Sequence, residues 1–175
     1  MADVIPRPTE GDVIDLILDD HRIFEELLRQ LRDETNDREG LRTILSRVLV
    51  AHAEAEEKVV YPQFRKKRAI DTDEAEHGKH EHDEGHEALL AVLEIKDTGS
   101  EDFGEAIKAL SEAVHHHLDE EEREILNPAR RDLSDQVRGE LGAAFARQRI
   151  AQMDDDCGNL GNVRELVERA HKRGD

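Results

Sequence analysis

The chain has 175 residues, enough for one domain with a substantial core but too few to expect two full domains. Charged residues make up 39% of it, aromatic residues 3%, and tryptophan is absent, which favours amphipathic helices over sheets built on aromatic pairs. The formal net charge of -18 argues against nucleic acid as a partner, because such binding relies on Lys and Arg displacing counterions from phosphates. The same acidic surface attracts cations.

A single cysteine, Cys157, excludes an internal disulfide, and no early apolar run follows a basic start. We therefore expect a cytoplasmic protein with no membrane segment. The stretch "DDDCGNLGN" around Cys157 is typical of a linker.

The spacing of apolar residues predicts a series of amphipathic helices. In chain order these helices cover roughly residues 10–34, 41–61, 73–95 and 103–128, followed by a weaker helix over 134–153 and a short one from 162. Thr9 and Asp12 form a candidate capping pair for the first helix. Pro62 is expected to end or bend the second helix, and Pro128 to close the fourth.

Four helices with short connections are expected to pack as an antiparallel up-down four-helix bundle. The predicted fold class is therefore all-α, with the bundle in residues 1–133 and a C-terminal helical extension in residues 134–175. Such bundles build metal and cofactor sites from polar residues at core positions. Polar residues that interrupt the apolar stripes are thus the candidates for function.

Residues three, four or seven apart share one face of a helix, so each histidine can be tested for an inward position. The polar residues that fall on the apolar stripes are His21, His52, Glu56, His82, His86, His117 and Glu121. The same geometry assigns four other histidines to the solvated faces: His77, His80, His115 and His116. The alternative is that they hydrogen-bond to metal ligands or bind a metal adventitiously.

An internal repeat supports the inward set independently. His21 and His86, His52 and His117, and Glu56 and Glu121 are each separated by 65 residues. The segments "HAEAEEKVVYP" and "HLDEEEREILNP" also share one pattern, a histidine, then two glutamates, then apolar residues before a proline. The chain therefore contains two copies of one helix pair. His82 has no counterpart, because Ile17 stands at the equivalent position.

A single core histidine is most often a structural residue, but five imidazoles and two carboxylates in one core indicate a binding site. Without counter-charge their burial costs on the order of several kcal/mol for each unpaired ion, and a bound cation removes that cost. Imidazole and carboxylate ligands without thiolate suit iron, manganese or zinc. Because the set exceeds the needs of one ion, a dinuclear non-haem iron site is the leading interpretation.

At these residues the sequence resembles the hemerythrin-like, or HHE cation-binding, family. The shared pattern is a histidine in the first helix, HxxxE in the second, one or two histidines in the third, and a histidine followed by a carboxylate in the fourth. The resemblance covers roughly residues 10 to 133. It implies a ligand set in which one iron is bound by His21 and His52, the other by His82, His86 and His117, with Glu56 and Glu121 as bridges.

The fourth helix departs from the respiratory hemerythrins, which place an aspartate five residues after the last histidine. Here Glu121 lies four residues after His117 and Glu122 five residues after it, a spacing that resembles the broader bacterial HHE group. Glu122 therefore remains an alternative to Glu121 as the bridging ligand. That group includes proteins linked to oxygen, iron or nitric oxide handling.

The resemblance implies a protein that binds, senses or stores dioxygen, a related diatomic or peroxide ligand, or iron. Turnover of peroxide or nitric oxide at the same site is the alternative. A ferritin-like oxidase would instead use Glu112-x-x-His115 and Glu74-x-x-His77, which lie off the stripes. A third hypothesis is a helical partner-binding protein that docks, or forms homo-oligomers, through residues 134–175.

Overall fold

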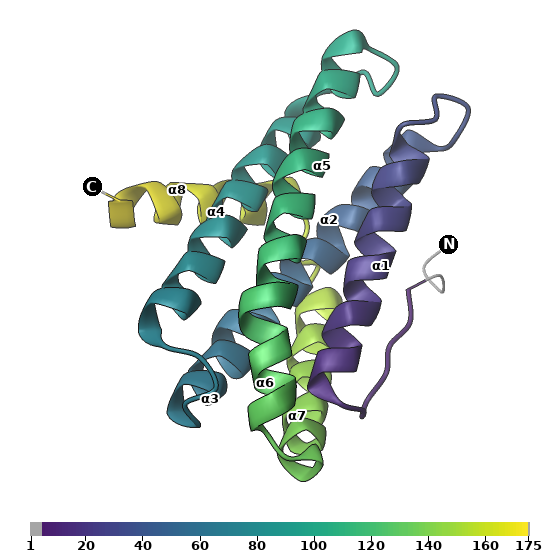
Figure 1. The fold of residues 1–175 in the computed structure, drawn as a ribbon. Coiled ribbons are helices and arrows are strands. Elements are labelled where there is room, and N and C mark those ends of the chain that lie inside the picture. Colours follow the sequence, from purple (N-terminus) through teal and green to yellow (C-terminus); the bar gives the residue numbers. More distant parts are fainter. Residues whose placement is uncertain (1–4, 175) are drawn as a thin grey trace.

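The computed structural model describes residues 5–174, and within this range the chain is all-helical and contains no strand (Figure 1). The elements are α1 (Val13–Leu31), α2 (Arg38–Ala55), η2 (Glu56–Val60), α3 (Tyr61–Lys66), α4 (Thr72–Glu94), α5 (Glu101–Glu121), η3 (Glu122–Leu126), α6 (Asn127–Asp132), α7 (Asp135–Asp154) and α8 (Leu160–Gly174). Because α2, η2 and α3 follow without a break, as do α5, η3 and α6, they make six continuous helices. The predicted all-α fold class is confirmed.

Side-chain caps set the helix starts. Asp12 alone caps α1 by accepting a hydrogen bond from the amide of Ile14, so α1 begins later than the Thr9 pairing predicted. Asp71 and Glu74 form a capping box at the start of α4. The loops that join α1 to α2 and α4 to α5 lie at the same end of the molecule, and the bundle helices pack antiparallel (Figure 1).

Pro62 and Pro128 do not end their helices. Each lies near the start of a short α-helix that continues a π-helical segment, η2 or η3. In η2 the amide of Tyr61 donates to the carbonyl of Glu56, five residues earlier. This wider turn lets the chain continue although a proline has no amide hydrogen for the ordinary pattern. Single π-turns within α-helices often occur at functional sites, and both segments here begin at or beside a predicted ligand.

The C-terminal helices pack on the bundle. α7 lies against α1 and α2, and α8 against α4 (Figure 1). Phe145 of α7 shares a buried cluster with Ile17 of α1, whereas α8 buries Val163 and Val167. Cys157, in the predicted linker, is buried and its thiol donates to the carbonyl of Arg47.

The division of the chain between residues 133 and 134 stays a prediction, as does association of chains through α7 and α8. No helix in residues 5–174 is long and apolar enough to cross a membrane.

Candidate metal centre

Six of the seven predicted ligands converge in the middle of the bundle. Their atoms form two groups, each with all ligand atoms within 4.8 Å of one another. We call the group of His21, His52, Glu56 and Glu121 the His52 half, and the group of Glu56, His82 and His117 the His82 half. All six residues are buried, and Glu56 belongs to both halves. The two halves therefore form one continuous cluster.

In the His52 half, four buried atoms without hydrogen-bond partners face one another. His21 Nε2 lies 3.2 Å from Glu121 Oε2, and His52 Nε2 lies 3.3 Å from Glu56 Oε1. None of these four buried atoms has a hydrogen-bond partner. Buried polar atoms without partners are rare in native structures because each costs free energy. A cation among them would satisfy all four at once, so the residues present fit a metal ion.

The separations in the His82 half are slightly shorter. His82 Nε2 lies 3.1 Å from both Glu56 Oε2 and His117 Nε2. Glu56 thus faces His52 with one oxygen and His82 with the other. Glu121 Oε2 lies 3.7 Å from His117 Nε2, in addition to its contact with His21. Both carboxylates are therefore placed to join the two halves.

A carboxylate stands behind each of the four clustered histidines. The Nδ1 pairs are His21 with Glu122 at 2.8 Å, His52 with Asp20 at 3.1 Å, His82 with Glu57 at 3.0 Å and His117 with Glu81 at 2.9 Å. Each pair holds its imidazole with Nε2 turned to the centre, the arrangement that metal-binding histidines ordinarily have. The apolar-stripe criterion missed Asp20 and Glu81, although each directly precedes a clustered histidine in the sequence.

The two candidate bridging glutamates of the fourth bundle helix occupy different places. The side chain of Glu121 is fully buried within the cluster, whereas that of Glu122 is 45% exposed and accepts from His21. The geometry therefore favours Glu121 as a ligand, whereas Glu122 orients the imidazole of His21.

Asp20 in turn is held by Arg149 of α7. The guanidinium donates two hydrogen bonds, from Nε to Asp20 Oδ2 at 2.8 Å and from Nη2 to Oδ1 at 2.7 Å. Both residues are buried, with 2% and 3% exposure. The ring of Phe145, one turn earlier on α7, meets the ring of His52 edge-on at 5.8 Å. The C-terminal extension therefore supports His52 directly.

Tyr61 covers the two carboxylates from α3. Its hydroxyl donates to Glu121 Oε1 at 2.6 Å and lies 3.4 Å from Glu56 Oε2, while its ring stacks on His82. Burial, together with the charges of Glu121 and Glu56, raises the pKa of Tyr61 well above its usual value. The hydroxyl therefore keeps its proton and leaves the remaining carboxylate oxygens free.

Without a metal, protons supply the positive charge of the cluster. Burial alone would lower the pKa of His52, but Glu56 and Asp20 raise it to about 10. Burial likewise opposes the charge on His82, but Glu56 and Glu57 raise its pKa to about 10. Burial would raise the pKa of Glu56, yet His52 and His82 hold it well below the usual range. A metal ion that enters must displace these imidazole protons.

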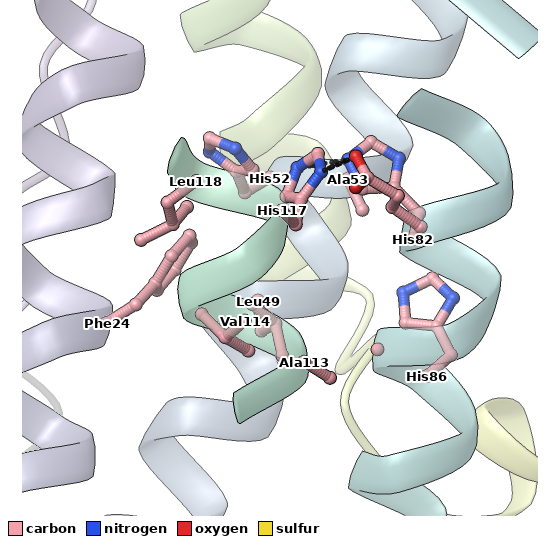
Figure 2. A pocket seen from close by; sticks show the side chains of 12 residues that line it. Phe24, Leu49, His52, Ala53, His82, His86, Ala113, Val114, His117 and Leu118 are labelled. Carbon is pink, nitrogen blue, oxygen red and sulfur yellow. Dashed lines mark hydrogen bonds and ion pairs between the residues drawn. The ribbon is translucent and has the colours of Figure 1, made fainter. Parts of the chain in front are cut away.

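His86 is the one predicted ligand that the structure leaves outside both groups. Its buried Nε2 has no partner, and the residue lines a cavity of about 20 Å³ beside His82 and His117 (Figure 2). Burial, with the nearby charge of His82, lowers the pKa of His86 to about 4. The imidazole is therefore neutral and able to bind a ligand or a metal.

The remaining histidines of α4 and α5 lie outside the core. The side chains of His77, His80 and His116 are 50%, 69% and 61% exposed, as the helix geometry predicted. His115 is half-buried and its Nδ1 pairs with the carbonyl of Ser111. Glu112 is exposed and Glu74 caps α4, so neither ferritin-like motif reaches the centre.

A helical bundle with a buried His/Glu cluster of this kind defines a class of cation-binding protein. Comparison with known families gives the particular one, since the model of the hemerythrin HHE cation binding domain matches residues 12–129. The chain belongs to the hemerythrin HHE cation-binding family.

One curated relative is an uncharacterised hemerythrin-like protein of Schizosaccharomyces pombe, 33% identical over 100 residues. The match covers 57% of this chain and 49% of that protein, so the chain spans about half the length of its relative. No solved structure matches the chain significantly.

Proposed function

We propose that this protein is a non-haem diiron protein that binds, senses or stores dioxygen or a related small molecule. The observation that carries the proposal is the convergence of four buried atoms that have no hydrogen-bond partner, His21 Nε2, His52 Nε2, Glu56 Oε1 and Glu121 Oε2. The fold alone does not require these groups in its core. A metal explains why their burial is tolerated.

The two halves suggest how the ligands are shared. One ion would be held by His21 and His52, the other by His82 and His117, with Glu56 and Glu121 between them. Iron suits this mixture of imidazole and carboxylate, and zinc or manganese are the alternatives for the same donors. A pair of irons would supply the redox change and the open coordination position that a diatomic ligand requires.

The cavity that His52, His82 and His117 line is suited to a small ligand. Its volume of about 20 Å³ exceeds the roughly 10–15 Å³ that one water molecule needs. Phe24, Leu49, Val114 and Leu118 line one side of it, and these apolar side chains disfavour water relative to a weakly polar diatomic molecule (Figure 2). His86 lies at the other side with its unpaired Nε2.

Metal analysis of the iron-loaded protein tests the proposal. After anaerobic loading with ferrous iron and desalting, the wild type should retain about two irons per chain. The variant His52→Ala should lose most of this iron, whereas His80→Ala, which changes an exposed histidine of α4, should retain it. Aeration or nitric oxide should then change the absorption spectrum of the wild type reversibly. Equal iron in the wild type and His52→Ala would refute the proposal.

Turnover of peroxide or nitric oxide is the second candidate, and His86 is the observation that favours it. A neutral buried imidazole beside a small cavity can hydrogen-bond to a bound molecule and orient it for reaction. Repeated peroxide consumption without loss of iron, slowed at least tenfold by His86→Leu, would favour turnover. A stable adduct that forms and dissociates reversibly would favour binding.

A further inference from the structure

A second group of histidines and glutamates lies between α4 and α5, next to the central cluster and open to solvent through its histidines. His77, Glu81 and Glu120 offer ligand atoms that all lie within 4.8 Å of one another. His116 approaches the same two carboxylates from α5. The four residues form two His/Glu pairs, each spaced i,i+4, one pair on each helix. We call them the surface cluster.

The separations within the surface cluster approach those of a four-coordinate metal. Bonds of about 2.0–2.2 Å in a tetrahedral site place neighbouring ligand atoms roughly 3.3–3.6 Å apart. His116 Nε2 lies 3.4 Å from Glu81 Oε1 and 3.6 Å from Glu120 Oε1, and His77 Nε2 lies 3.6 Å from Glu81 Oε1. Only the contact of His77 with Glu120 Oε2, at 2.7 Å, is an ordinary hydrogen bond.

Glu81 supplies an independent sign of a ligand. Its side chain is only 4% exposed, although its neighbours His77 and His116 are half-exposed or more. Glu81 Oε2 accepts a hydrogen bond from His117, but Glu81 Oε1 is buried and has no hydrogen-bond partner. That unpaired oxygen faces both surface imidazoles. A carboxylate oxygen in this position is costly unless a cation binds it.

We propose that His77, Glu81, His116 and Glu120 form a binding site for one divalent transition-metal cation of the Zn²⁺ or Fe²⁺ type. Two imidazoles and two carboxylates without thiolate suit such ions. The exposed histidines give the ion direct access from solvent. Glu81 Oε1 would contact this ion, while Glu81 Oε2 accepts a hydrogen bond from His117. One carboxylate therefore separates the surface site from the central cluster.

Cobalt(II) is a suitable probe because its absorption bands report tetrahedral coordination. Equilibrium dialysis against Co²⁺ should give the wild type about one more bound ion per chain than the double variant His77→Ala/His116→Ala. The difference spectrum of the two proteins should show the bands of tetrahedral Co²⁺. Glu81 is left unchanged, because it also orients His117. Glu120→Gln, a change at a side chain that is 24% exposed, should reproduce the loss.

His80→Ala is the matched control, since His80 forms an exposed i,i+4 pair with Glu84 on the same helix but lies outside the surface cluster. This variant should bind as many cobalt ions as the wild type. Equal cobalt binding by the wild type and the double variant would overturn the proposal, as would an equal loss in His80→Ala.

Iron content of the same proteins keeps this test separate from that of the central site. The surface variants should load the central cluster with the same amount of iron as the wild type. A protein that lacks central iron but shows the extra cobalt ion would refute only the proposed function.

Discussion

The two halves of the central cluster differ in how firmly the surrounding protein holds them. The His52 half is fixed from behind by Asp20 and Arg149, and aromatic rings of Phe24 and Phe145 meet His52 edge-on. The His82 half contains a direct contact of two imidazoles at 3.1 Å and has the unpaired histidine His86 nearby, whereas the cavity that His86 lines also borders His52. Every histidine of both halves has a carboxylate at Nδ1, but the His52 half adds a buried guanidinium and two aromatic rings, whereas the His82 half lies next to the neutral imidazole of His86.

This difference suggests a division of labour. The His52 half would retain its ion through preorganised ligands, because their geometry is set before the metal arrives. The His82 half would bind the exogenous molecule, since His82 and His117 line the cavity together with the unpaired His86. Variants that affect the halves separately can break or sharpen this comparison.

The largest difference is expected between His52→Ala and His86→Ala. His52 lies within the cluster, so its removal should reduce bound iron by at least half. His86 lies outside both groups, so its removal should leave most of the iron in place while weakening ligand binding. Iron per chain and the spectral response to nitric oxide measure the two effects. Equal loss of iron in both variants would show that His86 is a ligand of equal importance.

Arg149→Met should strongly destabilise the protein. The substitution leaves the carboxylate of Asp20 buried without its charged partner, and breaking such a pair costs about 3–5 kcal/mol. Denaturant unfolding measures this loss. The double variant Arg149→Met/Asp20→Asn should recover part of it, because the uncompensated charge is removed. A loss below about 1 kcal/mol would contradict a supporting role of α7.

The pH dependence of the metal-free protein should report His86. Its pKa falls from the usual 6.5 to about 4 on folding, so the unfolded chain binds the proton more readily. Stability is therefore lost as pH falls from 6.5 toward 4, by up to about 1.4 kcal/mol per pH unit from this one group. Unfolding measured across that range should show a shallower dependence in His86→Leu than in the wild type. Parallel curves would contradict burial of a neutral His86.

Two glycines of α4 give the smallest and most closely matched pair of effects. A methyl group at Gly78 would lie 2.9 Å from the hydroxyl of Tyr61, so Gly78→Ala should destabilise by about 1–3 kcal/mol. A methyl group at Gly85 meets nothing within 4 Å, so Gly85→Ala should stabilise the helix by about 0.5–1 kcal/mol. Thermal unfolding of both proteins checks the opposite signs. The same sign in both would argue against the placement of Tyr61.

Periodicity predicted the fold and the inward faces because both depend on local spacing. His52 and Glu56 share a stripe, and the copy at His117 and Glu121 confirmed the pattern within the sequence itself. The apolar stripe shows which face of a helix a residue lies on, but not whether its axial position matches that of the cluster. His86 is one turn from His82, about 6 Å along the axis, and this displacement places it beyond the cluster.

The contacts that support the ligands could not be predicted from local sequence patterns, because they depend on how distant helices pack. The buried carboxylate of Asp20 is paired with Arg149, which lies 129 residues further along the chain. Likewise, the sequence around Pro62 could not distinguish the end of a helix from the π-helical turn that lets it continue. Glu81 is adjacent to a predicted ligand, yet its contact with His117 depends on how α4 and α5 pack.

Anomalous diffraction at the iron edge from crystals of the iron-loaded protein tests the central claim most directly. We expect two strong peaks, one among His21, His52, Glu56 and Glu121, and the other among Glu56, His82 and His117. The absence of peaks at both positions, with histidines and glutamates still converging there, would contradict the account.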